Sequence, residues 1–186
     1  MSSRRLNFTA LALLAAGLTA GCSLPASTVN TTPATGGHTA EASAPNPPSV
    51  AKIGSTLDLT GASSGEKMAV TPVKVINHAH GADMFSSPDH GKRFFAVKFK
   101  LENIGSAVYN DSPGNGAEVV DSSGQSYDSD FNDVHGCQSF PGSEKIAPGD
   151  TGVGCIVWQV PKHAKITKIQ FTLDSGFADD TGQWQA

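Results

Sequence analysis

The chain has 186 residues, of which 16% are charged and 7% aromatic, and its formal net charge is −4. Its basic residues are scattered and form no stripe that would neutralise a row of phosphates, so we expect no nucleic-acid partner. Low charge together with 20 glycines and 11 prolines is typical of an extracytoplasmic β protein with many turns, and argues against a helical cytosolic enzyme.

The beginning of the chain has the three regions of a secretory signal peptide. A basic start, Arg4 and Arg5, precedes an apolar run over 6–18, and small residues follow before Cys22. The apolar run is too short for a permanent membrane span. The stretch Leu-Thr-Ala-Gly-Cys resembles a bacterial lipobox, although Thr19 stands where leucine is usual. This resemblance implies that Cys22 is lipidated and begins the mature chain; a plain secretory signal with a chance cysteine is the alternative.

The next segment, up to residue 50, is rich in Ser, Thr, Pro and Ala and has almost no large apolar side chains. Such a composition buries too little surface to offset the entropy of ordering, so we expect a disordered tether. The predicted organisation is a lipoprotein signal peptide at 1–21, a lipidated cysteine and linker at 22–50, and a folded domain at 51–186. The predicted location is the extracytoplasmic face of the cell membrane, held there by the lipid.

From residue 51 onward, apolar residues recur with a period of two. Between Phe95 and Leu101 they alternate with polar residues, which predicts a strand with one wet face. The stretch 154–160 is apolar on both faces, as in a central strand. The pattern of 67–76 changes parity at Pro72, which predicts an edge strand that bulges or switches sheet there.

Turn signals rich in Gly, Pro, Asn and Asp separate these runs from further strand-like segments. The number and hairpin-like spacing of the segments predict an all-β fold, an antiparallel β-sandwich of seven to eight strands. The segments are 57–60, 68–76, 94–103, 117–121, 126–131, 139–146, 153–160 and 166–173.

Three of these stretches, 91–105, 120–127 and 147–161, together resemble a widespread family of secreted Gram-positive lipoproteins whose domain has no known function. That family is similar in turn to the telokin-like, immunoglobulin-like domain of a mycobacterial secreted immunogenic protein. The similarity spans roughly 53–184. It implies an Ig-like sandwich on an exported chain and brings no catalytic residues with it.

The three cysteines divide by role. Cys22 belongs to the lipobox, which leaves Cys137 and Cys155 as a pair in an oxidising compartment, and we expect them to form a structural disulfide. The family does not require this pair, although it fits an actinobacterial branch. A redox or metal-binding role is the alternative, but the pair lacks a Cys-x-x-Cys spacing and an adjacent base.

Two histidines form the most plausible metal motif. His78 and His80 lie two residues apart, on one face if a strand continues through them, and His90 or His135 would have to complete a site. Metal sites need three or four ligands, and only two are spaced convincingly, so we expect no metal and no cofactor. A copper- or zinc-binding accessory protein is the alternative function.

The sequence contains no catalytic motif: no nucleophile elbow, no zinc-protease helix and no phosphate-binding glycine loop. The acidic residues Asp128, Asp130 and Asp133, and the pair Asp179-Asp180, do not match a calcium loop and are expected in solvated loops. We therefore predict that the protein is no enzyme but a non-catalytic binding or interaction module at the cell surface. Its expected partners are the membrane, through the lipid, and an unidentified protein or envelope component.

Overall fold

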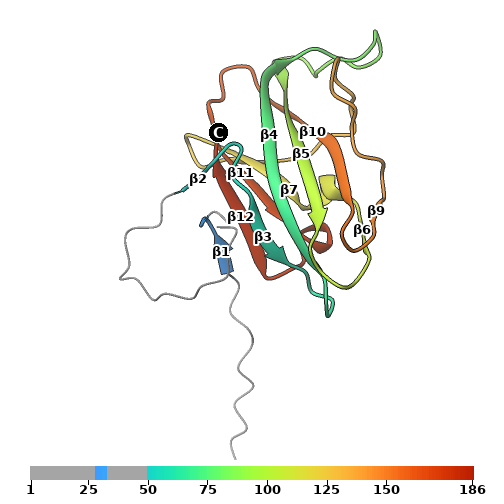
Figure 1. Cartoon of the computed structure of the whole chain (residues 1–186). Coiled ribbons are helices and arrows are strands. Elements are labelled where there is room, and N and C mark those ends of the chain that lie inside the picture. The colour runs from blue at the N-terminus through green and yellow to red at the C-terminus, as the bar shows by residue number, and fades with distance from the viewer. Residues whose placement is uncertain (1–27, 33–49) are drawn as a thin grey trace, which may run out of the picture.

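The computed structural model describes residues 28–32 and 50–186. The described chain consists mainly of β-strands, and two short 3-10 turns interrupt them (Figure 1). Within this part of the chain, no helix has the length and apolar character needed to span a membrane. The strands are β1 (Thr28–Asn30), β2 (Ala51–Lys52), β3 (Leu57–Thr60), β4 (Lys67–Ala79), β5 (Lys92–Asn103), β6 (Tyr109–Asp111), β7 (Ala117–Asp121), β8 (Ser126–Asp128), β9 (Glu144–Ile146), β10 (Thr151–Pro161), β11 (Ile166–Thr172) and β12 (Asp180–Gln185).

Two sheets pack face to face, which confirms the predicted Ig-like β-sandwich. One sheet has the order β1-β12-β11-β7-β8, with β2 also paired to β12, and the other has the order β10-β5-β4-β3. A short ribbon of β6 and β9 completes the described strands. Among the described strands, the pairings are antiparallel except those of β1 and β2, which both run parallel to β12.

The core lies between the two sheets and is rich in aromatic side chains. Phe99 of β5 packs against Phe171 of β11 at a ring-centroid distance of 5.4 Å and against Trp184 of β12 at 6.5 Å. Trp158 of β10 is fully buried and donates its indole N–H to the carbonyl oxygen of Ala117. Each of these rings removes a large apolar area from water, which is the main force holding the sheets together.

Strand β5 confirms the predicted alternation on one face only. Phe95, Val97, Phe99 and Leu101 all point into the core between the sheets. The other face was expected to be wet, but Ala96 is fully buried there, in a second and smaller cluster. The reason is a long segment that folds over this face and is described below.

Strand β4 has the bulge predicted from its proline. The pairing register with β5 shifts between Pro72 and Lys74, so that one extra residue is accommodated. Because of the shift, Val75 returns to the core side, opposite Val97, while Val73 is half exposed. Strand β3 pairs only with the first part of β4, so the remainder is an edge, as the sequence predicted.

Strand β10 differs from its prediction as a central strand. Both of its faces are buried, as the sequence indicates, but it lies at the end of its sheet, and β5 is the only described strand paired with it. Its outer edge meets isolated bridges at Val157 and Cys155 rather than another strand of the sheet. A run that is apolar on both faces therefore marks here an edge strand covered by a loop.

The N-terminal part of the chain corrects the expectation of a disordered tether. That expectation is wrong for Thr28–Asn30, which form β1 along the edge of β12. The expectation of disorder was based on how little apolar surface this segment can bury, whereas β1 is held by the hydrogen bonds of its backbone and polar side chains. The predicted signal peptide, Cys22 and the linker residues 23–27 and 33–49 lie outside the described residues.

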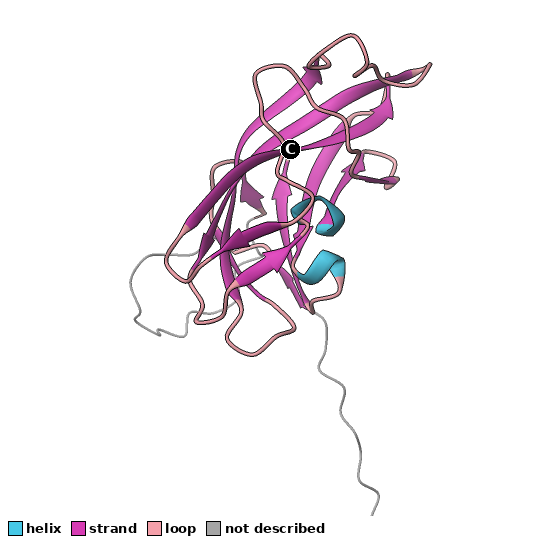
Figure 2. Ribbon diagram, turned by 90° about the vertical axis from the view of Figure 1, so that its right-hand side faces the viewer, coloured by secondary structure: helices cyan, strands magenta, loops and turns pink. Residues whose placement is uncertain are grey.

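The 3-10 turns η1 (Pro113–Gly116) and η2 (Asp174–Gly176) lie beside each other, as Figure 2 shows. Gly116 allows η1 to approach this region closely, because a Cβ atom there would come within 1.9 Å of the carbonyl oxygen of Thr172 at the end of β11 and 3.2 Å of the backbone nitrogen of Gly176 in η2. In η2, Asp174 and Ser175 have φ values of 52° and 54°, in the left-handed region. Hydrogen bonds from other parts of the chain hold both residues in this conformation.

Candidate functional site

The segment 129–143, here called the cystine loop, connects β8 to β9 and covers the outer edge of β10. Its backbone N–H at Asp130 donates to the carbonyl of Val157 at 2.7 Å, and the N–H of Cys155 donates to the carbonyl of Gln138 at 2.8 Å. The disulfide between Cys137 and Cys155 joins the loop to the strand, with a Cα–Cα distance of 5.8 Å. The structure thus contains the disulfide predicted from the sequence.

The cystine loop also builds the second hydrophobic cluster. Val134 and Cys137 pack from the loop onto the face of β5 and β10 that points away from the main core. Such packing fixes the loop in place, so that its two arms can form the walls of a site. The buried members of the cluster are Phe94, Ala96, Val134, Cys137, Cys155 and Val157.

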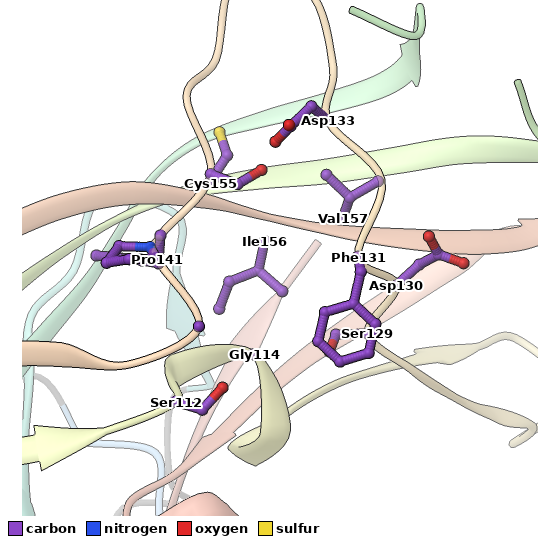
Figure 3. A pocket seen from close by; sticks show the side chains of 13 residues that line it. Ser112, Gly114, Ser129, Asp130, Phe131, Asp133, Pro141, Cys155, Ile156 and Val157 are labelled. Atoms are coloured by element: carbon purple, nitrogen blue, oxygen red, sulfur yellow. The ribbon is translucent and has the colours of Figure 1, made fainter. Parts of the chain in front are cut away.

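A pocket of about 250 Å³ lies between the two arms of the cystine loop and η1. Figure 3 shows Phe131 and Ser129 on one side, Pro141 on the other, and Ile156 of β10 between them. Phe131 is 90% exposed, so its ring stands at the rim without packing into the domain. The hydroxyl oxygen of Ser139, also part of the lining, is buried and has no hydrogen-bond partner among the described residues. The pocket therefore offers an aromatic surface to a ligand.

Of the two aspartates that line this pocket, Asp133 is exposed and Asp130 is partly buried. Burial of its carboxylate raises the pKa, but hydrogen bonds from Gln159 and Asn132 outweigh that effect and leave the pKa below its ordinary value. The Gln159 amide donates to one carboxylate oxygen at 2.7 Å, and the Asn132 backbone N–H donates to the other at 2.9 Å. The carboxylate is consequently ionised and fixed in direction at neutral pH. The expectation of a merely solvated residue is wrong for Asp130, whereas Asp128 and Asp133 are exposed.

The aspartates Asp179 and Asp180, at the start of β12, also differ from each other in exposure. Asp179 is exposed, as expected. The carboxylate of Asp180 accepts hydrogen bonds from the Thr28 hydroxyl and from the Thr60 backbone N–H, so it links β1, β3 and β12. Its role in the structure is to hold strands together.

The histidines predicted as possible metal ligands are brought only partly together. His78 and His80 are both exposed near the end of β4. The backbone N–H of His135 donates to the carbonyl of His80 at 2.8 Å, so these two residues are neighbours across a short pairing. Among the described residues, however, no three His, Cys, Asp or Glu side chains converge in a way that would hold a metal ion.

A cluster of carboxylates was not apparent in the sequence. It lies near the beginning of β4, whereas the histidines lie near the end of that strand. Glu66 is only 7% exposed, and its pKa is raised by burial and by the neighbouring Asp174. Asp111 accepts hydrogen bonds from the N–H and hydroxyl of Ser175, at 2.6 and 2.5 Å. The buried Tyr109 hydroxyl has no hydrogen-bond partner in the part of the chain that the structure describes, and its pKa is raised by burial and by these carboxylates. The polar run Ser-Ser-Gly-Glu, a typical turn sequence, gave no signal of this burial.

The comparison with known families covers most of the folded domain. Residues 61–181 match the family described as a domain of unknown function (DUF4352). The chain belongs to this family. No curated protein matches its sequence. Membership confirms the predicted resemblance at the level of the domain.

Solved structures share the fold at low sequence identity. The secreted protein MPT63 of Mycobacterium tuberculosis is 15% identical with a TM-score of 0.51, over 73% of this chain and 95% of that one. The "putative lipoprotein (ycdA)" of Bacillus subtilis is 14% identical with a TM-score of 0.50, over 69% of this chain and 38% of that one. These likenesses establish a shared β-sandwich fold.

Proposed function

We propose that this protein is a lipid-anchored extracytoplasmic protein whose sandwich is a non-catalytic binding module at the cell surface. The signal peptide and the lipobox ending at Cys22 support the location. The descriptions of the two structural neighbours, one as secreted and one as a lipoprotein, are in keeping with it. The anchor is tested by Cys22→Ser, which should release the protein into the medium. A variant that stays with the membrane as fully as the parent refutes the lipid anchor.

The observation that carries the binding role is the pocket beside Phe131. Large exposed aromatic rings next to a concave surface are enriched where proteins bind partners. The walls of this pocket are fixed by a disulfide and by hydrogen bonds to β10, so the site is formed before a ligand arrives. Among the described residues, no histidine is hydrogen-bonded to a serine or aspartate side chain of the pocket. A serine hydroxyl needs such a base to act as a nucleophile, so the pocket gives no support to an enzymatic role.

The binding role is tested by capture of envelope components with the disulfide-intact domain. The Phe131→Ser variant should lose most of the captured material, because it removes the ring at the rim of the pocket. Phe85→Ser is the matched control, since Phe85 is 86% exposed in the separate β4–β5 connection. Equal loss in both variants indicates non-specific adsorption to exposed rings. Retention by Phe131→Ser refutes this pocket as the binding site.

A further inference from the structure

Strand β1 attaches the chain to the sandwich very soon after Cys22. The Thr28 backbone N–H donates to the Asp179 carbonyl at 2.9 Å, and the Thr28 hydroxyl donates to the Asp180 carboxylate. The Asn30 side-chain amide donates to the carbonyl of Asp58 in β3 at 3.0 Å. The strand is thus tied both to β12 and to β3, and Figure 1 shows it beside the start of β12.

This attachment shortens the distance over which the domain can move from a lipid on Cys22. Six peptide units separate Cys22 from Thr28, and a fully extended chain of that length spans at most about 20 Å. A tether running unpaired as far as Val50 would have 28 units, with a reach of about 100 Å and a typical extension of about 30 Å as a flexible coil. With β1 in place, the sandwich has to stay next to the bilayer.

The direction of β1 decides which end of the sandwich lies nearest the lipid. Because β1 runs parallel to β12, the chain reaches it from the end at which β12 begins. That end is formed by the connections 61–66, 104–108 and 173–179. They are joined to one another, since Ser106 N–H donates to the Gly65 carbonyl and Ala62 N–H donates to the Asp174 carboxylate, at 2.8 and 2.6 Å.

These three connections, here called the anchor end, expose apolar side chains to solvent. Phe177 is 86% exposed, Val108 is 58% exposed and Ile104 is 40% exposed. Large apolar side chains of this kind partition into the boundary between headgroups and acyl chains. We infer that the anchor end is a membrane-facing surface, pressed against the bilayer by the short link from Cys22 to β1; this inference rests on the proposed lipid anchor.

The charge of the anchor end indicates that the link, rather than electrostatic attraction, holds it there. Four acidic residues lie in or next to the three connections, with Lys67 as the adjoining cation, and the whole chain has a net charge of −4. The acidic residues are Glu66, Asp174, Asp179 and Asp180. Anionic lipids would repel such a surface. We therefore expect the Cys22→Ser protein to show no affinity of its own for vesicles of phosphatidylcholine and phosphatidylglycerol.

The orientation is tested with the full lipidated chain in such vesicles, carrying a fluorophore on Phe177→Cys or, as the control, on Phe85→Cys in the connection at the opposite end of β4. Nitroxide-labelled lipid should quench the label at position 177 more strongly, by about twofold or more, because apolar side chains insert 5–10 Å into the boundary. Equal quenching, or stronger quenching at position 85, overturns the inference. Failure of the lipidated chain to float with vesicles instead refutes the anchor itself, and the inference with it.

A second pair of variants ties the orientation to β1. Asn30→Pro removes the amide that bonds to Asp58 and places proline in a strand of three residues, so the quenching ratio should fall towards one. Val29→Ala alters an exposed side chain of the same strand and should leave the ratio unchanged. An unchanged ratio in Asn30→Pro, with the melting temperature of the domain preserved, refutes the role of β1.

Discussion

The ionisation of single side chains changes the stability of this domain in opposite directions, and Asp121 and Glu66 are the clearest examples. Asp121 stands at the end of β7, and its carboxylate closes the hairpin to β8. It accepts hydrogen bonds from the Ser123 hydroxyl at 2.6 Å and from the Tyr127 hydroxyl at 2.8 Å. These bonds lower its pKa to about 2. The ionised carboxylate is therefore part of what keeps the hairpin closed.

We expect Asp121→Asn to lower the melting temperature at pH 7. A depressed pKa stabilises the fold above the unfolded value near 4, and this contribution is lost as the pH falls from about 4 to about 2. The difference between variant and parent should accordingly shrink over that range. Thermal denaturation at pH 7, 4 and 2 measures it, with the exposed Asp128→Asn in the same hairpin as the control. A difference that stays constant down to pH 2 contradicts this assignment.

Glu66 should behave in the opposite way. Its pKa is raised in the folded state, first by burial and then by Asp174, so the native state binds more protons than the unfolded state just above the ordinary value of 4.5. Stability is lost as the pH rises through that window. We expect Glu66→Gln to melt at a higher temperature than the parent at pH 7 and at a similar temperature below pH 4.5. The exposed Glu118→Gln is the control; a Glu66→Gln protein that is less stable at pH 7 disproves the interpretation.

At the scale of elements, the cystine loop is predicted to depend on its disulfide. The bond between Cys137 and Cys155 closes a separation of 18 residues. A loop of that size is expected to contribute about 3 kcal/mol, mainly by restricting the unfolded chain. Urea denaturation with and without reductant should show a lower midpoint for the reduced protein. The Cys137→Ser, Cys155→Ser double variant should be insensitive to reductant, and an unmoved midpoint in the parent refutes the stabilising role.

Strand β12 contributes one large apolar side chain to the main core. Trp184 is fully buried against Phe99, and its indole N–H donates to the carbonyl of Ser55 at 2.8 Å. Trp184→Ala leaves a cavity in the main core and should cost about 3–5 kcal/mol. The neighbouring Gln185→Ala, at an exposed position, should change stability by less than about 0.5 kcal/mol. Chemical denaturation of both variants measures the difference; similar losses would mean that the strand is held mainly by its backbone.

For the whole molecule, the sequence predicted the parts in which local pattern decides the structure. The alternation of β5 and β11 and the parity change at Pro72 located strands and a bulge, because side-chain period is a local property. Strand β12 was missed because only Trp184 in it is large and apolar. The pocket could not be predicted either, since it exists only where the cystine loop crosses back over β10. Cys137 of the loop and Cys155 of β10 nevertheless gave a usable signal for that crossing.

The placement of β1 and β2 on the same strand has a consequence for self-association. They lie one after the other along β12, opposite Asp180–Gly182 and Trp184–Gln185, and together they occupy the β12 edge of the larger sheet, whose other edge is β8. An unoccupied edge is a template for a strand from another copy, whereas very short strands at an edge discourage such pairing. A chain cut between these two segments would uncover the first half of that edge. We expect such a truncated protein to form dimers or larger species in sedimentation velocity experiments, while the intact domain remains monomeric.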